Sequence, residues 1–338
     1  MRNRISIVIP VFQNELNIAP TYQALKSEFE KIDSFEFEIV FINDGSTDNS
    51  WHELLQVYNA DPEHITLINL LRNFGQVPAM LAGFANAAGD CVIAMSADLQ
   101  DPPAVILEMI EEWNRGHKLV VATRESRRDG FLNRLASQVF YRLMRKFAIP
   151  NMPVGGYDFF LIDRSVVELL LQMDERNPFL QGQILWMGHP PKLIHYERRK
   201  RELGKSQWGL SRKIKYFIDG FVAYSFFPIR VVSVVGIGVF FLGLILSAMI
   251  AVETILWGTK SVGWSSLMVA LLTLNGLQMM MIGIIGEYLW RNFDETRKRP
   301  LYLIENINRS KRIAETYPRR GSEDIIHKEA QKEPVSKA

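Results

Sequence analysis

Cysteine is nearly absent from this sequence, which contains only Cys91. An internal disulfide is therefore excluded, and the apolar run CVIAM around Cys91 predicts a small buried side chain rather than a nucleophile. The six histidines are scattered singly, so a metal centre built from histidine and cysteine is not expected. The composition also excludes a disordered, a collagen-like and a disulfide-stapled chain.

Charge is almost absent between residues 231 and 290. Two runs in this region, 231–252 and 262–286, carry no charged side chain. At 1.5 Å per residue each run would reach roughly 33 Å or more as a helix, enough for a hydrocarbon core of about 30 Å. We therefore expect two membrane-spanning helices, with a pair of buried helices in a soluble core as the alternative. The charged residues in the region are Glu253, Lys260 and Glu287.

Lysine and arginine flank both apolar runs, which predicts that the two flanks stay in the cytoplasm and that the short connecting loop lies outside. The expected localisation is thus the inner (plasma) membrane, with both termini cytoplasmic and with membrane lipids as partners. Asn275 and Gln278 in the second run are expected to hydrogen-bond a neighbouring helix, which favours a homo-oligomer. The flanking cations are Arg212, Lys213, Lys215, Arg230, Arg291, Arg297, Lys298 and Arg299.

The first 209 residues alternate short apolar runs with amphipathic segments. This alternation predicts an α/β domain with a mostly parallel sheet flanked by helices. Residues 210–230 mix cations with aromatics and predict an interfacial amphipathic segment, or else an extension of the first span. Residues 291–338 predict a basic cytoplasmic tail, disordered from about Pro318. Strands are expected at 5–10, 37–42, 65–69, 91–95 and 119–123, and helices at 17–31, 50–59, 76–88 and 104–115.

Polar and acidic residues directly follow three of the predicted strands, at 10–15 (PVFQNE), 43–48 (NDGSTD) and 96–103 (SADLQDPP). In an open parallel sheet, ligands bind beyond the carboxyl ends of the strands. Carboxylates gathered there suit Mg²⁺ or Mn²⁺ bridging to a diphosphate. Taken singly, NDGSTD and DLQDPP could instead be a turn and a capped helix entry. A phosphate-binding glycine loop is missing, so a metal ion and arginines would hold the phosphates.

Five motifs occur in a fixed order: VIPVFQNELNI, NDGSTDNS, SADLQDPP, GGYDFFLIDR and RELGKSQW, followed by the two apolar runs. Together they resemble the family-2 glycosyltransferases of the polyprenyl-phosphate type, over roughly residues 4 to 295. The resemblance implies a GT-A fold that binds a nucleotide-sugar and a divalent metal and inverts the anomeric centre.

On the donor side, the resemblance places Pro10 and Glu15 at the nucleoside pocket and Asp44 on the base or ribose. It gives Asp98 and Gln100 to the metal and the diphosphate. The family usually has Asp-x-Asp where this sequence has Ser96-Ala97-Asp98, so the metal shell lacks one carboxylate.

On the acceptor side, the resemblance places Asp158 near the acceptor oxygen, and Arg201 and Lys205 in a loop that closes over the diphosphate. Arg124 and Arg134 are expected to hold the lipid phosphate. A turn residue is the alternative for Asp158, and a solvated surface cation is the alternative for the arginines. Relatives often have arginine at Phe160 and lysine at Gln207, so these contacts differ here.

The predicted reaction is inverting transfer of one sugar, with UDP-glucose favoured as donor, to undecaprenyl or another polyprenyl phosphate at the cytoplasmic membrane face. Two alternatives remain. One is a processive polysaccharide synthase, although its Gln-x-x-Arg-Trp motif is absent. The other is a membrane-tethered protein that binds sugar nucleotides without turnover, with Ser96 as the mark of lost catalysis. Nucleic acid is not an expected partner.

Overall fold

The computed structural model describes residues 3–124, 141–153, 157–198, 225, 227–257 and 263–316, apart from positions 33, 143, 147 and 174. Its centre is a mixed eight-stranded sheet in the order β7-β5-β6-β4-β1-β2-β3-β8. β6 and β8 run antiparallel to their neighbours, whereas the other pairs are parallel. The strands are β1 (Asn3–Val11), β2 (Phe35–Asn43), β3 (Ile65–Leu70), β4 (Cys91–Ala94), β5 (Leu119–Arg124), β6 (Phe159–Asp163), β7 (Lys192–Tyr196) and β8 (Ile304–Asn308).

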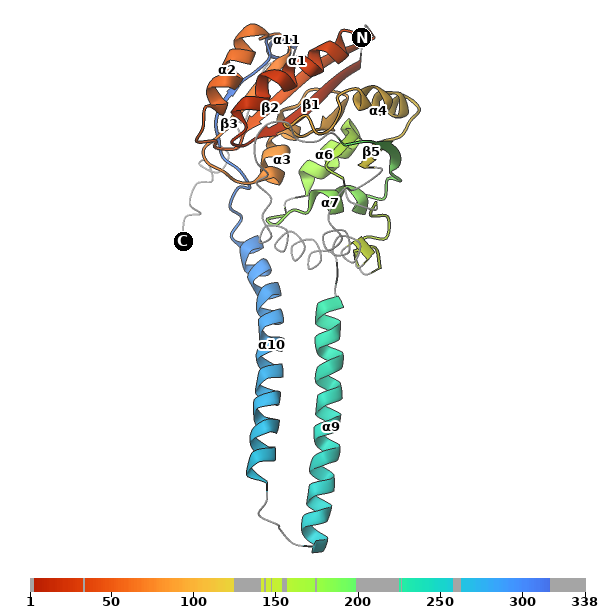
Figure 1. Cartoon of the computed structure of the whole chain (residues 1–338), viewed down its shortest axis with the longest axis vertical. Coiled ribbons are helices and arrows are strands. Elements are labelled where there is room, and N and C mark those ends of the chain that lie inside the picture. Colours follow the sequence, from red (N-terminus) through yellow and green to blue (C-terminus); the bar gives the residue numbers. More distant parts are fainter. Residues whose placement is uncertain are drawn as a thin grey trace, which may run out of the picture.

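Helices cover both faces of this sheet, because its central strands are apolar on both sides (Figure 1). Ile7 and Phe41 belong to the core under α1, α2 and α4, while Val8 and Ile42 belong to the core under α3, α6 and α7. This arrangement confirms the predicted α/β class with a mostly parallel sheet. The helices are η1 (Glu15–Asn17), α1 (Ile18–Phe29), α2 (Ser50–Ala60), α3 (Gln76–Asn86), α4 (Val105–Asn114), α6 (Arg164–Gln172), α7 (Leu180–Trp186), α9 (Phe227–Trp257), α10 (Trp264–Thr296) and α11 (Lys311–Thr316).

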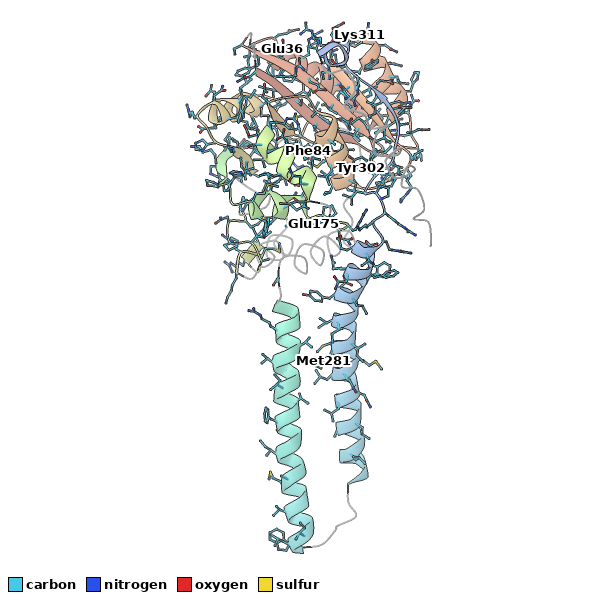
Figure 2. The ribbon with its side chains drawn as sticks, turned by 180° about the vertical axis from the view of Figure 1, so that it is seen from behind. Glu36, Phe84, Glu175, Met281, Tyr302 and Lys311 are labelled. Atoms are coloured by element: carbon cyan, nitrogen blue, oxygen red, sulfur yellow. The ribbon has the colours of Figure 1, made fainter. Side chains whose placement is uncertain are left out.

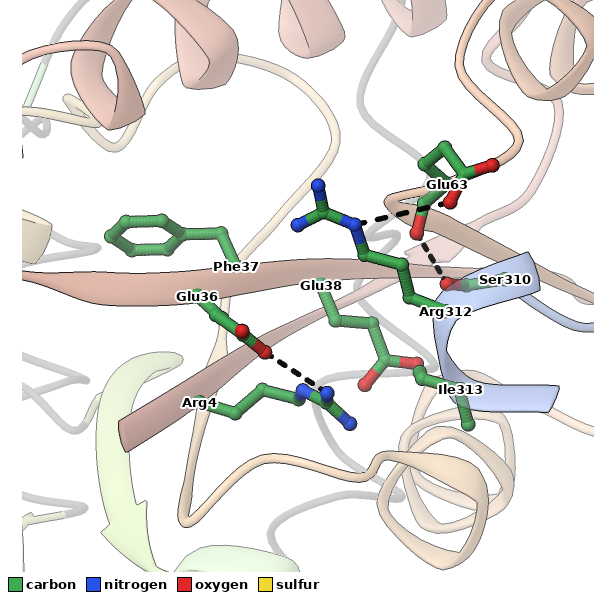
Figure 3. A pocket seen from close by; sticks show the side chains of 8 residues that line it. All are labelled: Arg4, Glu36, Phe37, Glu38, Glu63, Ser310, Arg312 and Ile313. Carbon is green, nitrogen blue, oxygen red and sulfur yellow. Dashed lines mark hydrogen bonds and ion pairs between the residues drawn. The ribbon is translucent and has the colours of Figure 1, made fainter. Parts of the chain in front are cut away.

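The last strand, β8, comes from the segment that the sequence assigned to a basic tail. It pairs antiparallel with β3 and so covers a row of backbone groups that an edge strand would leave unpaired. The chain after β8 is also tied down, since the Ser310 hydroxyl donates to the Glu63 carbonyl (Figure 3). The Lys311 backbone amide donates to the Pro62 carbonyl at 2.9 Å. Residues 304–313 are therefore part of the α/β domain.

The two long helices α9 and α10 lie side by side and extend away from the domain (Figures 1 and 2). Met281 on α10 packs over Gly236 on α9, where a Cβ atom would lie 2.8 Å from its terminal methyl group. At its carboxyl end α10 is held by the domain: the Arg176 amide donates to Glu295 at 2.7 Å and the Asn177 side chain donates to Asp294 at 3.2 Å.

A membrane-spanning helix is not found in the described part of the chain: none there is both long enough and apolar enough to cross a bilayer. A span needs about 20 consecutive, predominantly apolar residues. This finding contradicts the localisation expected from the sequence, a multi-pass inner-membrane protein with spans at 231–252 and 262–286 and both termini cytoplasmic. The expected interfacial segment at 210–230 lies largely outside the described residues.

Candidate functional site

Chemically active side chains gather at the edge of the sheet where the parallel strands end. Asp44 follows β2, Asp98 lies shortly after β4, and Arg124 is the last residue of β5. Because β6 runs in the opposite direction, Asp158 precedes it and lies at this same edge. The topology therefore brings these four residues to one edge of the sheet.

Asp44 is a buried carboxylate at the start of the loop after β2, only 3% exposed. Its two oxygens accept hydrogen bonds from the backbone amides of Phe74 at 2.7 Å and Gly75 at 3.0 Å. Burial raises the pKa of the Asp44 carboxyl to about 6, against the opposing effect of these two hydrogen bonds. Asp44 therefore holds the loops after β2 and β3 together and changes its charge at mildly acidic pH.

Gly45, next to Asp44, has a backbone that a side chain would not fit. Its φ is +61°, and a Cβ atom there would lie 2.3 Å from the backbone carbon of Arg72. We expect Gly45→Ala to lower the free energy of unfolding by more than the roughly 1–2 kcal/mol of the left-handed conformation alone. Gly188→Ala is the matched control, because Gly188 has φ +82° and open space around it. Urea unfolding of both variants measures the difference, and equal losses would contradict the predicted backbone clash.

Glu15 and Pro10, expected at the nucleoside pocket, lie beside this loop. The Glu15 carboxylate accepts from the Asn49 amide at 2.8 Å, just before α2 begins. Pro10 pairs with Ile42 in the β1–β2 register. Gln13, between them, has a left-handed φ of 47°. Its backbone N–H donates to the Ser46 hydroxyl at 3.1 Å. The loops after β1 and β2 are thus joined by hydrogen bonds into one unit.

The acidic loop after β4 is organised by Ser96. Its hydroxyl lies 2.8 Å from a carboxylate oxygen of Asp98 and also 2.8 Å from one of Asp101. A hydroxyl has one proton, so it donates to one of these carboxylates at a time. Two carboxylate oxygens consequently converge on one point, and both side chains are largely buried, at 8% and 1% exposure.

A divalent cation fits this donor set when a diphosphate completes the coordination. Among the described residues no three acidic, histidine or cysteine side chains are grouped closely enough to hold a metal unaided. Mg²⁺ is commonly bound through one or two carboxylates together with substrate phosphates, so three protein ligands are not required. Asp98 is the candidate ligand, and its carboxylate accepts a hydrogen bond from the backbone N–H of Gln100 at 3.3 Å.

On the other side of Asp101 lies a group of basic and acidic side chains. The Arg124 guanidinium lies 3.5 Å from the Asp158 carboxylate. The side-chain amide of Gln181 donates to the same carboxylate at 3.2 Å. The Tyr196 hydroxyl donates to Asp101, and Nε of Arg198 lies 3.7 Å from the same carboxylate. Asp101 therefore connects the acidic loop with the arginines.

Asp158 is half exposed, yet the protein atoms packed around its carboxyl desolvate it and raise its pKa. The Arg124 guanidinium opposes this rise in the pKa of Asp158, and the Asp101 carboxylate adds to it. An exposed carboxylate beside a guanidinium can orient an incoming anion without being a strong base.

Sequence reasoning missed two members of this group and assigned no role to a third. Tyr196 and Arg198 were passed over, and Asp101, within the segment SADLQDPP, was given no role. The rule that ligands bind beyond strand ends applies to Tyr196, which ends β7, and to Arg198 just after it, but no strand was expected at 192–196. Arg134, Arg201 and Lys205 lie outside the described residues, so their expected roles stay predictions.

Comparison with known proteins identifies the family. Glycosyl transferase family 2 matches residues 6–171. The prophage bactoprenol glucosyl transferase homolog of Escherichia coli K12 is 38% identical over 307 residues, which cover 90% of this chain and 100% of that protein. The chain belongs to glycosyl transferase family 2. It is therefore a glycosyltransferase, as the five motifs predicted.

Other members of glycosyl transferase family 2 match over the same length. The bactoprenol glucosyl transferase of Shigella phage SfV is 37% identical across 90% of this chain and 98% of its own. The putative glycosyltransferase CsbB of Bacillus subtilis is 36% identical across 90% and 92%. Among solved structures, glucosyl-3-phosphoglycerate synthase from Mycobacterium tuberculosis with UDP covers 64% of this chain and 79% of its own, at 15% identity and a TM-score of 0.44.

Proposed function

We propose that this glycosyltransferase moves one glucose from UDP-glucose to a polyprenyl phosphate with inversion of the anomeric centre. The observation that carries the proposal is the arrangement at the sheet edge, where the carboxylates after β4 and the arginines around Asp158 meet at Asp101. A nucleoside diphosphate with its cation suits the first group, and an anionic acceptor suits the second. The names of the relatives from Escherichia coli K12 and Shigella phage SfV, at 38% and 37% identity, support glucose and bactoprenol.

In the proposed donor site, Asp44 accepts a hydrogen bond from the base or ribose, and Asp98 with Gln100 holds Mg²⁺ or Mn²⁺. The cation would supply positive charge against the diphosphate. Pro10 and Glu15 lie at the end of the same loops that would face the nucleoside. The proposed roles of Arg201 and Lys205, which would neutralise the leaving diphosphate, rest on the sequence motif alone.

In the proposed acceptor site, Arg124 and Arg198 grip the phosphate of the lipid. Nε of Arg198 is buried 3.7 Å from the Asp101 carboxylate and makes no hydrogen bond to the described residues, so its hydrogen-bonding capacity is not used there. Arg134 is a third candidate from the sequence. Asp158 orients the phosphate and takes at most one proton, because a monophosphate is already anionic near neutral pH.

The reaction then follows from geometry and charge. A phosphate oxygen of the acceptor attacks the anomeric carbon from the face opposite UDP, forming one carbon–oxygen bond as the bond to UDP breaks. The electron pair of the broken bond leaves with UDP, and the configuration inverts. The protein contributes positioning and stabilisation of the developing charge on UDP.

The test is a turnover assay with purified protein, undecaprenyl phosphate, Mn²⁺ or Mg²⁺, and a panel of UDP- and GDP-sugars. A lipid carrying one glucose, formed from UDP-glucose, supports the proposal. A polymer would favour a processive synthase, and nucleotide binding without turnover would favour a sugar-nucleotide-binding protein. Either of the last two results contradicts the proposed reaction.

The raised pKa of Asp44 gives the donor site a predicted pH dependence. Above pH 6 the carboxylate is ionised and accepts hydrogen bonds, whereas below its pKa of about 6 it is protonated. We expect uridine to bind about tenfold more weakly at pH 5 than at pH 7, since about one in ten Asp44 carboxyls remains ionised at the lower value. Uridine is the probe because it has no phosphate that titrates in this range. Calorimetry or NMR titration measures the affinity.

The control for this pH dependence is Asp44→Asn, which has no charge to lose. It should bind uridine weakly at both pH values, because its amide nitrogen would face a backbone N–H donor. A wild-type affinity that does not change between pH 7 and pH 5 would contradict the assignment.

A further inference from the structure

Glu305 lies at an irregularity of the last strand. In the β3–β8 register, Asn69 is opposite Asn306 and Leu70 is opposite Ile304, so Glu305 is the extra residue between two paired positions. A bulge of this kind redirects a side chain. Here the Glu305 carboxylate accepts a hydrogen bond from the side-chain amide of Asn69 at 2.6 Å. The contact joins positions 236 residues apart in the sequence.

From Glu305 a chain of hydrogen bonds leads to the donor-side loop. The side-chain NH₂ group of Asn43 donates to the side-chain oxygen of Asn69 at 2.7 Å. The side-chain oxygen of Asn43 accepts from the backbone N–H of Ser46 at 3.2 Å. The Ser46 hydroxyl in turn accepts a hydrogen bond from the backbone N–H of Gln13. Asn43 and Asn69 are 3% and 8% exposed, so their polar groups depend on these partners.

The direction of this chain is set at its Glu305 end. An ionised carboxylate only accepts hydrogen bonds, so the NH₂ group of Asn69 must face it. The oxygen of Asn69 then faces Asn43, and the oxygen of Asn43 faces the Ser46 amide. If Asn69 turned over, the chain would reverse and the NH₂ group of Asn43 would meet the N–H of Ser46, donor against donor.

We propose that Glu305 is a positioning residue for the nucleotide-binding loop 43–48, acting through the orientation of the Asn69 and Asn43 side chains. It does not touch the nucleotide itself. The inference rests on the proposed function, which assigns this loop to the nucleoside. It gives the strand added after the two long helices a role in donor binding.

Three substitutions at one position separate orientation from mere packing. Glu305→Gln keeps an oxygen that can accept from Asn69, and it should bind UDP within about twofold of wild type. Glu305→Ala removes the acceptor and should bind a few-fold more weakly. Glu305→Lys supplies only donors and so favours the reversed chain; we expect about tenfold weaker UDP binding, the size of a typical coupling between linked groups. Asn306→Lys is the matched control, on the same strand and also exposed.

Two measurements decide the outcome: UDP affinity by calorimetry, and amide hydrogen exchange at Ser46 without nucleotide. The proposal expects faster exchange at Ser46 and weaker UDP binding in Glu305→Lys, with Glu305→Gln and Asn306→Lys close to wild type and melting temperatures unchanged. Equal exchange and affinity in all variants would overturn it, as would losses that only follow the melting temperature. If wild type bound no UDP, the proposed function would fail, while exchange at Ser46 would still test the hydrogen-bond chain.

Discussion

Replacing Asp98 by alanine is expected to lower kcat/KM for the donor by roughly 10²–10³, about 3–4 kcal/mol of transition-state stabilisation. Asp98 is the largely buried carboxylate that converges with Asp101 on the Ser96 hydroxyl. Without it the proposed cation keeps only Gln100 of its two proposed protein ligands. Steady-state kinetics over a range of Mn²⁺ concentrations measures the effect, and the variant should need far more metal to reach its maximal rate.

Ser96→Ala is the matched control for Asp98→Ala. It removes the hydroxyl that both carboxylates share and leaves both carboxylates in place. We expect turnover to fall much less than in Asp98→Ala. Full turnover in Asp98→Ala, with an unchanged metal requirement, would show that the cation is held elsewhere.

Arg124→Ala is expected to reduce kcat/KM for the lipid acceptor by about 100-fold or more while leaving UDP affinity unchanged. The guanidinium ends β5 and contacts Asp158 at 3.5 Å, so its loss removes a phosphate contact and leaves Asp158 without its cation. Loss of a charge-assisted, two-pronged contact has this magnitude. Arg124→Lys should recover part of the activity, since lysine keeps the charge but not the planar fork.

Arg115→Ala controls for the loss of an arginine outside the site. Arg115 follows α4 at the opposite end of the sheet and pairs with Glu112. The activity of the Arg115→Ala variant should match that of the wild type. If Arg124→Ala weakened UDP binding as strongly as acceptor use, Arg124 would belong to the donor site and the assignment would be wrong.

The central strands could be predicted closely because burial on both faces leaves a continuous apolar run in the sequence. The run expected at 119–123 is β5 (Leu119–Arg124), and the one expected at 65–69 is β3 (Ile65–Leu70). β8 was not predicted, because its residues IENIN carry no such run. It is a strand only because the open edge of β3 is there to receive it.

Some residues of the candidate site could likewise be predicted from the sequence, and others could not. Asp44 directly follows β2, whose residues 39–42 are apolar, and Asp98 lies shortly after β4, which is apolar throughout, so their position at the sheet edge could be predicted. Tyr196 ends β7 and Arg198 follows it. The residues of β7 alternate between buried and exposed, so the hydrophobic pattern of this strand is weaker. The bridging role of Asp101 depends on partners at positions 96, 196 and 198, which no local pattern connects.

The scarcity of charge between residues 231 and 290 predicted two long helices in this region, and α9 and α10 are there. The localisation inferred from that scarcity is contradicted by the finding on the described helices.

By itself the sequence determined the class of the fold, the order of the central strands and helices, and the family, because hydrophobic periodicity and short motifs are local properties of the chain. Only the tertiary structure decided that Asp101 links the acidic loop to Arg198, and that Glu305 reaches Asn69 across 236 residues. The physical reason is that hydrogen bonds and ion pairs depend on distance and direction in space. These are set by the packing of the sheet and its helices, and not by neighbours along the chain.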